Sequence, residues 1–451
     1  MGYARSDSDL RGDLADRTGD HAEVLGTPPL AEPHRAQAQS FGGPSLADHG
    51  ARIGDTSGKH IGPKRRTAQP TVIHDRYSDS SVQYLGKGFV MAYTSTRGDI
   101  GDRVGEVMQA WLPLRLAAAE GTAFEVSSFT APPAGYSGRT AFFTAAWIDQ
   151  FGVGHAEDLV LRAQAENHQL FTMPDAPRQA DVMQRLGTQG IRVPDIVGIE
   201  RDAAVLGSPF YVMRRVRGRT PSDVPSWHKR GWTVDLSAAD RGLLCDNGLR
   251  ALVDVHRVDD PDTLRFLRGV VDPTRTALQR YLDKLSGWYE WCRADLVVGA
   301  DVLAEALRVL LESAPDTDAE TVVWGDARVG NMCFGDDLSV VALFDWETAG
   351  TGPPDIDLGW WLMFERFLCE ALGFTRLPGI PDDDEIIRRY LQFGGTLTGE
   401  IAYYQLLAAF VLSLINSRLA RLLVRDGLDA ATARSYPQTS VALVERYLGQ
   451  I

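Results

Sequence analysis

The sequence predicts an α+β fold of two lobes, a small antiparallel sheet lobe followed by a larger, mainly helical lobe. Short apolar runs typical of strands, separated by turn residues, fill the stretch from residue 101 to residue 217. After Gly218, long stretches carry apolar residues at helical spacing. We therefore expect three parts: an N-terminal segment at 1–90, a sheet lobe at 91–217 and a helical lobe at 218–451.

The N-terminal segment is polar, and its sparse apolar residues follow no period up to about residue 85. Such a segment cannot bury enough apolar surface to offset the entropy lost on ordering, so we expect it to be disordered. A second interpretation is that translation starts at Met91, just before the first helical pattern. Peptides from residues 1–85 in mass spectra of the protein from its natural host would exclude this later start.

The sheet lobe shows helical spacing first and then apolar runs of strand length. A turn of small residues between the first two runs indicates a hairpin. The expected elements, in chain order, are a helix at 104–112, strands at 124–129, 141–147 and 158–162, a helix at 179–186, and strands at 196–200 and 209–216. This order predicts an antiparallel sheet with one inserted helix.

In the helical lobe, two short strands around a loop interrupt a series of helices. The strands are expected at 321–324 and 340–344, and the helices at 240–256, 276–296, 358–368, 384–393, 400–421 and 430–448. The most apolar stretch, at 406–415, is too short to span a membrane.

Composition excludes collagen-like, disulfide-scaffold and wholly disordered proteins, and charge disfavours some binding partners. The 451 residues are 44 % hydrophobic and 24 % charged, which is ordinary for a soluble globular chain. The formal net charge of −14 disfavours binding to nucleic acid or to an anionic membrane surface. The four cysteines are widely spaced, which disfavours structural zinc and fits a reducing, cytoplasmic compartment.

Polar residues with a chemical meaning gather between residues 324 and 358. Asp326 and Asn331 stand five apart in a loop after a strand, and Asp345 directly follows the next apolar run. A loop carboxylate can accept a proton from a hydroxyl, while an amide oxygen and a second carboxylate are the hard ligands that Mg²⁺ prefers. Singly, each residue is explained by turn formation. Together, in this order, they favour phosphoryl transfer.

A turn in the sheet lobe offers a place for phosphates. Gly135 and Gly138 flank a Tyr-Ser pair between two expected strands, so the backbone can approach a ligand closely and Ser137 can donate to a phosphate oxygen. The alternative is an ordinary hairpin turn. The sequence contains no Walker A motif, which disfavours a P-loop nucleoside triphosphatase.

The 324–358 segment is similar to the catalytic core of the aminoglycoside phosphotransferase and choline kinase superfamily, which has the protein-kinase-like fold. The family pattern His-Gly-Asp-x4-Asn, Asp-Trp-Glu and Asp-Leu corresponds here to Trp324-Gly-Asp-Ala-Arg-Val-Gly-Asn331, Asp345-Trp-Glu347 and Asp357-Leu358. The resemblance covers about residues 95–450. It is strongest to actinobacterial phosphotransferase-domain proteins and to kinase-like domains found with acyl-CoA dehydrogenases.

The resemblance implies a role for each residue of the pattern. Asp326 would be the catalytic base, Asn331 and Asp345 would hold Mg²⁺, and ATP would lie between the lobes. Asp357 would order the catalytic loop or cap the following helix. Trp324 replaces the family's His, and a large aromatic side chain can fill the packing site beneath the loop.

Two arginines occupy positions where protein kinases carry lysine. Arg328 could act in catalysis by steadying the transferred phosphate, or it is a surface arginine. Arg162 would hold the phosphates in a bidentate manner. The usual Glu partner of that cation is replaced by Gln179, with Asp181 nearby, and which of these two orients Arg162 is left open. Met213 falls at the expected hinge, where its backbone would bind adenine.

The expected function is therefore ATP- and Mg²⁺-dependent phosphate transfer to a hydroxyl of a small molecule. Aminoglycosides, choline-like amines, sugars and hydroxylated acyl groups remain open as acceptors, as do GTP in place of ATP and the oligomeric state. The acidic stretch at 381–385 could attract a cationic acceptor, or it is a solvated helix start. The alternative function is a pseudokinase-like, nucleotide-binding regulatory module, which the departures at Trp324, Arg162 and Gln179 keep open.

Overall fold

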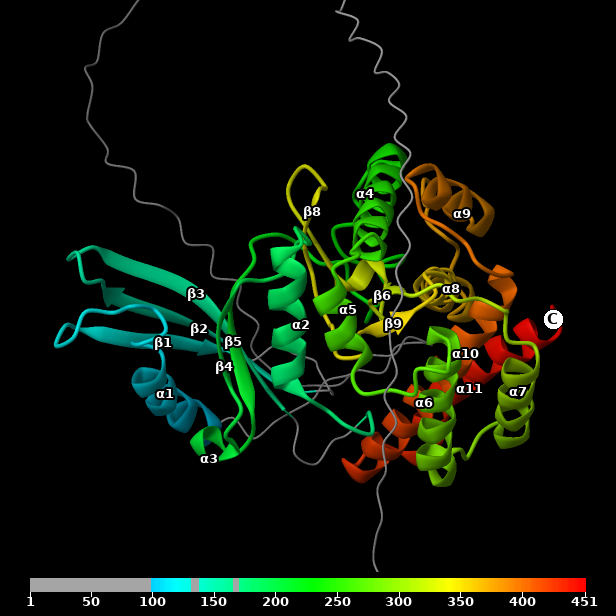
Figure 1. Cartoon of the computed structure of the whole chain (residues 1–451), viewed down its shortest axis with the longest axis horizontal. Coiled ribbons are helices and arrows are strands. Elements are labelled where there is room, and N and C mark those ends of the chain that lie inside the picture. Colours follow the sequence, from blue (N-terminus) through cyan, green and yellow to red (C-terminus); the bar gives the residue numbers. More distant parts are fainter. Residues whose placement is uncertain (1–98, 131–137, 165–169) are drawn as a thin grey trace, which may run out of the picture. The chain divides into compact units, whose positions relative to one another are not determined.

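A five-stranded antiparallel sheet in the order β1-β2-β3-β5-β4 forms the first lobe of the computed structural model, which describes residues 99–130, 138–164 and 170–451 (Figure 1). The strands are β1 (Phe124–Thr130), β2 (Gly138–Ile148), β3 (Gly154–Gln164), β4 (Ile196–Glu200) and β5 (Phe210–Arg214). Every neighbouring pair runs antiparallel, which confirms the predicted sheet.

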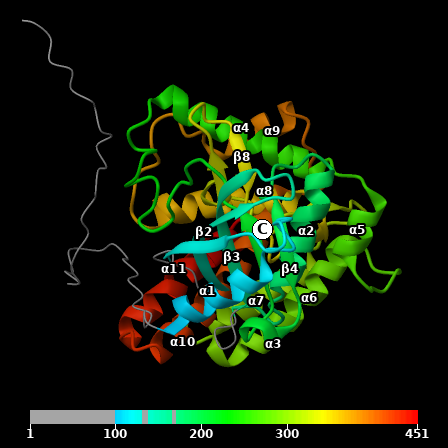
Figure 2. The same cartoon turned by 90° about the vertical axis from the view of Figure 1, so that its left-hand side faces the viewer.

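Helices cover the two faces of this sheet, because successive side chains of a strand point to opposite sides. Phe210 and Val212 of β5 pack in one core cluster with α1 (Asp99–Trp111), whereas Tyr211 packs in another with α2 (Ala176–Thr188). The second cluster continues into the helical lobe, so α2 lies between the sheet and the helices of that lobe (Figure 1). Figure 2 shows the same arrangement from the side of the sheet. The short helix α3 (Ala203–Leu206) precedes β5.

The helical lobe contains the expected helices, and two more that the sequence analysis did not predict. Its helices are α4 (Ala238–His256), α5 (Pro261–Arg268), α6 (Ala277–Cys292), α7 (Ala300–Glu312), α8 (Asp355–Arg366), α9 (Asp383–Gln392), α10 (Ile401–Arg425) and α11 (Ala430–Leu448). The unexpected helices are α5 and α7. Helix α5 has only eight residues, too few for a reliable period, whereas α7 carries Leu303, Ala306 and Leu310 at helical spacing and was detectable from the sequence.

Two small sheets in the helical lobe frame the loops with the motif residues. The expected strands β6 (Thr321–Val323) and β8 (Val340–Leu343) are present. They pair with two further strands of three residues each, β9 (Gly350–Gly352) and β7 (Met332–Phe334), respectively. These partners are too short to leave a recognisable pattern in the sequence.

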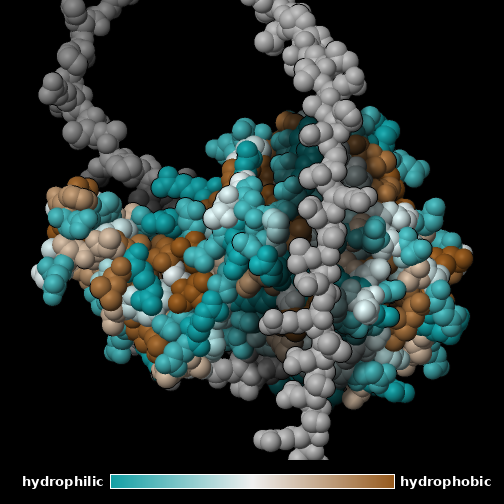
Figure 3. Space-filling view, viewed as in Figure 1, coloured by the Kyte–Doolittle hydropathy of each residue, from teal (hydrophilic) through white to brown (hydrophobic). Residues whose placement is uncertain are grey.

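Helix α10 is longer than the apolar stretch from which it was predicted. With 25 residues it is long and apolar enough to cross a membrane by length and composition, but 72 % of its most apolar window is buried inside the protein. It packs against α8 and α11 as a core helix of the lobe. On the face seen in Figure 3, apolar surface occurs in separate patches among hydrophilic residues.

The described residues all belong to the compact unit at 82–451. The predictions made for residues 1–90, and those for Gly135 and Ser137, concern positions outside the described ranges. We keep the predicted lobe boundary between residues 217 and 218 as a proposal. The term "sheet lobe" means the elements from α1 to β5, and "helical lobe" means those from α4 onward.

Candidate active site

The loop between β6 and β7 carries Asp326 and Asn331, and a buried carboxylate holds the start of this loop. Asp357, in the first turn of α8, is fully buried. Its Oδ2 accepts a hydrogen bond from the backbone N–H of Trp324 and its Oδ1 from that of Gly325, both at 2.7 Å. Because buried backbone donors require partners, these bonds fix the entry to the loop.

His256 supports the same carboxylate from the end of α4. Its Nε2 lies 3.0 Å from Oδ2 of Asp357, and its Nδ1 lies 2.7 Å from the hydroxyl of Tyr390. The ring is buried in the core of the helical lobe. It also belongs to a chain of hydrogen bonds that ends at the motif loop.

Both side-chain oxygens of Asp326 accept hydrogen bonds. Oδ1 accepts from Nε1 of Trp360 and from Nε of Arg328, each at 2.8 Å. Oδ2 accepts from Nδ2 of Asn331 at 2.6 Å. These donors fix the carboxylate's orientation, and the amide oxygen of Asn331 is turned away from Asp326 because the nitrogen faces it.

Asp345 follows β8 in a conformation that residues with a side chain rarely adopt, with a φ of +60°. Its Oδ1 is buried and has no hydrogen-bond partner among the described residues. Burial raises the pKa of Asp345, and the nearby cations Arg162 and Arg328 oppose this rise. The charges of Asp326 and Asp223 raise the pKa of Asp345 further. A buried, unpartnered carboxylate oxygen among other carboxylates is suited to binding a cation.

Arg328 lies between two carboxylates rather than on the surface. Its Nε donates to Asp326, and its Nη1 donates to Oδ2 of Asp223. The guanidinium lies 4.8 Å from the ring centroid of Phe364, and only 16 % of the side chain is exposed. The interpretation of Arg328 as a surface arginine is therefore wrong. The structure presents it as a cation that holds Asp326 in place.

Trp324 fills the space beneath the loop, as expected for a substitute of the family's His. The side chain is fully buried and stacks on Trp346 with ring centroids 5.3 Å apart. Its Nε1 donates to the backbone oxygen of Phe344 at 2.9 Å, directly before Asp345. The substitution thus ties the loop of Asp326 to the segment of Asp345.

Arg162 brings the sheet lobe to this site. It lies in β3 opposite Tyr211, on the face of the sheet that α2 covers, and its Nη1 donates to Oγ1 of Thr140 at 3.1 Å. Burial alone would lower the pKa of Arg162, but the charges of Asp345 and Glu347 raise it above the ordinary value. Arg162 therefore lies close enough to Asp345 and Glu347 for their charges to interact.

Gly138 makes room for that arginine. An added Cβ at this position would lie 2.9 Å from the backbone oxygen of Ala163 and 3.1 Å from Nε of Arg162. Such distances are closer than side-chain carbons normally approach, so glycine allows β2 and Arg162 to pack closely here.

The remaining sheet-lobe candidates lie near Arg162. Gln179 accepts a hydrogen bond at 3.4 Å from the hydroxyl of Tyr211, the residue opposite Arg162. Asp181 instead accepts hydrogen bonds from Nη2 of Arg201, which lies 2.7 Å from each of its carboxylate oxygens. Met213 lies in β5 one residue before the strand ends, where the chain leaves for the helical lobe. Asp181 is thus engaged by Arg201, whereas Gln179 contacts the residue that lies opposite Arg162.

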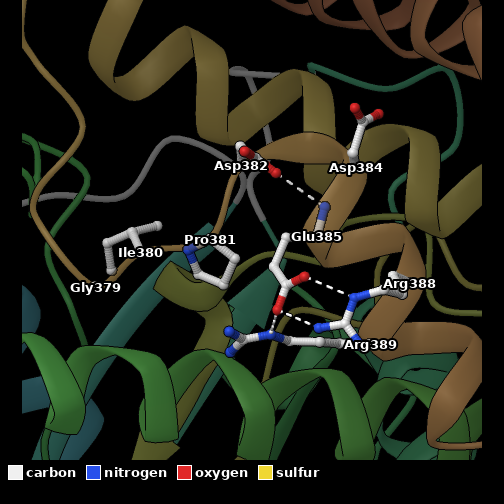
Figure 4. A pocket seen from close by; sticks show the side chains of 8 residues that line it. All are labelled: Gly379, Ile380, Pro381, Asp382, Asp384, Glu385, Arg388 and Arg389. Atoms are coloured by element: carbon white, nitrogen blue, oxygen red, sulfur yellow. Dashed lines mark hydrogen bonds and ion pairs between the residues drawn. The ribbon is translucent and has the colours of Figure 1, made fainter.

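The acidic stretch at 381–385 forms a helix start with internal partners. Asp382 caps α9 by accepting a hydrogen bond from the N–H of Glu385 at 2.9 Å. Glu385 pairs with Arg388 and Arg389, and a hollow of about 550 Å³ lies beside these groups (Figure 4). No residue of the Asp326 loop lines this hollow. The stretch therefore matches the interpretation as a solvated helix start.

Sequence analysis missed two residues of the site. Asp223 lies 105 residues before its partner Arg328, in a segment without a motif. Trp360 was detectable in principle, since it stands three residues after Asp357 in α8 and residues three apart share a helix face.

Comparison with known proteins shows to which family the chain belongs. The sequence matches the model of the family described as "Phosphotransferase enzyme family" over residues 128–403, more than half of the chain. The chain belongs to this phosphotransferase family. A solved structure of a Ralstonia eutropha protein assigned as an aminoglycoside phosphotransferase is 22 % identical, with a TM-score of 0.56 over 76 % of this chain and 98 % of that one. This likeness confirms the predicted kinase-like fold.

Curated relatives of this phosphotransferase-family chain are much longer proteins. Acyl-CoA dehydrogenase family member 11 of Mus musculus is 27 % identical over 223 residues, which are 47 % of this chain and 27 % of the relative. Family member 10 of the same organism is 23 % identical over 299 residues, 64 % of this chain and 26 % of the relative. The chain spans about a quarter of the length of these relatives.

Proposed function

We propose that the protein transfers the γ-phosphate of ATP to a hydroxyl group of a small molecule, with Mg²⁺ as the required metal. The observation that carries the proposal is the convergence of Asp326, Asn331 and Asp345. Asn331 donates to Asp326 through its side chain, and its backbone oxygen accepts from the N–H of Phe344, directly before Asp345, at 2.9 Å. Membership of the phosphotransferase family supports the reaction class.

The residues of the site fit Mg²⁺. Asp345 has a buried, unpartnered oxygen, and Asn331 has its amide oxygen directed away from Asp326. Among the described residues, no group of three or more His, Cys, Asp or Glu side chains could hold a metal. Mg²⁺ is commonly held by one or two protein oxygens together with water and substrate phosphates, so this small ligand set is adequate. Bound there, Mg²⁺ would neutralise charge on the phosphates.

Asp326 is the group that we assign to the acceptor hydroxyl. A carboxylate oxygen can accept more than one hydrogen bond, so a hydroxyl can bind Oδ2 while Trp360 and Arg328 keep Oδ1 in place. The hydroxyl proton then passes to Oδ2 as the hydroxyl oxygen bonds to the γ-phosphorus and the bond from phosphorus to the ADP oxygen breaks.

The sheet lobe supplies the positive charge for the nucleotide. Arg162 is half-buried on the face of the sheet that α2 covers, and we assign it to the phosphates. We assign the backbone near Met213 to the adenine ring, because β5 ends there and the chain passes to the other lobe.

The acceptor class remains a choice among hydroxylated small molecules. The name of the curated relatives places acyl-CoA thioesters with a hydroxyl group on the panel beside aminoglycosides, sugars and choline-like amines. We propose the cytoplasm as the compartment; the four cysteines are unpaired and buried, as in proteins of a reducing environment.

The deciding experiment measures ATP consumption by the purified protein against this panel, with and without Mg²⁺. For the best acceptor, Asp326→Ala is expected to lower turnover by roughly 10²–10⁴-fold, since it removes the proton acceptor, while nucleotide affinity measured by calorimetry stays unchanged. Undiminished turnover in Asp326→Ala would remove the mechanism.

The same preparation tests the alternative of a regulatory module. Slow ATP hydrolysis without an acceptor, abolished by Asp326→Ala, supports the enzyme. Tight ATP binding with no turnover on any acceptor, and no hydrolysis, supports the regulatory module instead.

A further inference from the structure

Arg178 stands at an unfavourable place for a cation. It lies in the first turn of α2, where its backbone N–H donates to the capping side chain of Asp175 at 2.9 Å. The amino end of a helix carries partial positive charge, which repels a cationic side chain. Burial also lowers the pKa of Arg178, because the charged form loses solvation. Its position therefore needs compensating contacts.

These contacts are backbone oxygens of the helical lobe. Both Nη atoms of Arg178 donate to the oxygen of Ala349, at 3.2 and 3.1 Å, and Nη2 also lies 3.3 Å from the oxygen of Leu267. Leu267 is in the last turn of α5, where carbonyl groups have no partner within the helix. A single side chain of the sheet lobe thus satisfies carbonyls from two separate segments of the helical lobe.

Ala349 ends the segment that begins with Asp345, here called the 345–349 segment. The segment starts where the N–H of Phe344 donates to the backbone oxygen of Asn331 at 2.9 Å. It turns where the N–H of Ala349 donates to the oxygen of Trp346 at 3.2 Å. The first end is therefore fixed by the motif loop, and the last end by Arg178.

A fixed segment matters because Asp345 has a left-handed backbone conformation, with a φ of +60°. Such conformations cost free energy and persist only when the surrounding structure enforces them. Arg162, in β3, lies close enough to Asp345 for the two charges to interact. Movement of α2 away from Ala349 would thus release one end of the segment whose other end carries Asp345.

We propose that Arg178 is a positioning residue that joins α2 to the 345–349 segment and holds Asp345 opposite Arg162. The structural part needs only the observed contacts, whereas the catalytic consequence rests on the proposed function. Arg178 contacts no group that we assign to the chemistry; it acts through the backbone at Ala349.

The structural part is tested by hydrogen exchange of the full-length protein without ligands. Arg178→Ala is expected to increase the exchange rate of peptides covering residues 344–350 by tenfold or more, with unchanged exchange in β3. Arg178→Lys keeps the charge but loses the bidentate guanidinium donor, so its exchange rate should lie between those of wild type and Arg178→Ala.

Arg185→Ala is the matched control. Arg185 is on the same helix, and its guanidinium lies 4.4 Å from the ring of Phe266, which Arg178 also approaches, at 5.7 Å. No hydrogen bond of Arg185 to a carbonyl is found in the described part of the chain. Arg185→Ala should leave exchange at 344–350 at the wild-type rate. Equal exchange in Arg178→Ala and Arg185→Ala would overturn the proposal.

The catalytic consequence is read from Mg²⁺ titrations of turnover with any acceptor found active. Arg178→Ala should raise the half-maximal Mg²⁺ concentration by about tenfold, the size typical for loss of a residue that orients a metal ligand, and Arg178→Lys should recover part of this. A fall in the maximal rate alone, with an unchanged Mg²⁺ requirement, would contradict positioning of Asp345. If no variant and no wild type turns over any acceptor, the proposed function fails while the exchange result still decides the role of Arg178.

Discussion

Trp360 donates its indole N–H to Oδ1 of Asp326 at 2.8 Å, so a residue of α8 orients the carboxylate that we assign to the acceptor hydroxyl. The indole also stacks on Phe364, with ring centroids 5.6 Å apart. Two roles are therefore combined in one side chain: the ring packs in the core of the lobe, and the nitrogen directs Asp326.

Trp360→Phe separates these roles, because phenylalanine keeps the stacking and loses the donor. A hydrogen bond to a charged group contributes about 1.5–3 kcal/mol, so we expect kcat to fall by roughly tenfold or more. The thermal unfolding midpoint should fall by no more than about 4 °C. The control is Trp291→Phe, at a tryptophan that lies near Arg418 in α10. A kcat equal to wild type in Trp360→Phe would show that Asp326 needs no help from this donor.

Asp345→Asn tests the metal ligand and has a second, opposite effect on stability. Burial raises the pKa of Asp345, so its ionised form is disfavoured in the folded protein without ligand, and a neutral amide removes that cost. We expect an unfolding midpoint equal to or above that of wild type. Mg²⁺-dependent ATP affinity should fall on the order of tenfold or more. Calorimetry showing unchanged affinity would count against a ligand role.

Asp357→Asn is expected to weaken both the fold and the reaction. An amide has only one oxygen, so it can accept from Trp324 or from Gly325 but not from both. Breaking the interactions of a buried carboxylate in this way costs roughly 3–5 kcal/mol of the free energy of unfolding. Chemical denaturation would measure this loss. Asp355→Asn is the comparison, since Asp355 is equally buried but accepts from Thr398 instead of the motif loop. It should destabilise the protein while the remaining folded enzyme keeps its kcat.

Glu320→Gln gives a pH-dependent prediction. Glu320 accepts from Arg268 at 2.8 Å and from Arg280 at 2.6 Å. Burial would raise the pKa of Glu320, but the hydrogen bond from Arg268 and the two cations lower it. A lowered folded-state pKa gives stability that is present above the unfolded value, near 4.5, and is lost as the pH falls through the folded value.

At pH 7 we therefore expect Glu320→Gln to lower the free energy of unfolding by about 1–3 kcal/mol. The difference from wild type should shrink as the pH falls below about 4.5. Glu305→Gln, which removes the partner of the exposed Arg308, serves as the control and should have no measurable effect at either pH. A difference that grows toward acid pH would contradict the assignment.

The motif residues were predictable because their spacing is local. A spacing of only five positions keeps Asp326 and Asn331 close in space, and Asn331 donates to Asp326. The strands of the sheet lobe and its helices α1 and α2 were predictable for a similar reason, since their apolar period lies within each element, whereas the four-residue α3 was not predicted.

Contacts between distant segments were not predictable from one sequence. Asp223 meets Arg328 across 105 residues, and Arg178 meets Ala349 across 171 residues. The local sequence around either arginine does not indicate its partner, because the partner is set by where whole helices and strands lie in the folded protein. The surface interpretation of Arg328 was wrong for this reason: the side chain is polar, but the loop buries it against Phe364.

The stacked indoles of Trp324 and Trp346 give the protein an optical signature of its own. Two tryptophan rings 5.3 Å apart and 29° from parallel are close enough for their transitions to couple, so they should contribute an exciton-type circular dichroism band in the far ultraviolet. Because one ring precedes Asp326 by two positions and the other follows Asp345 directly, the band would report on the arrangement of both segments without any added dye. Nucleotide entry could then be followed in real time on the unlabelled chain.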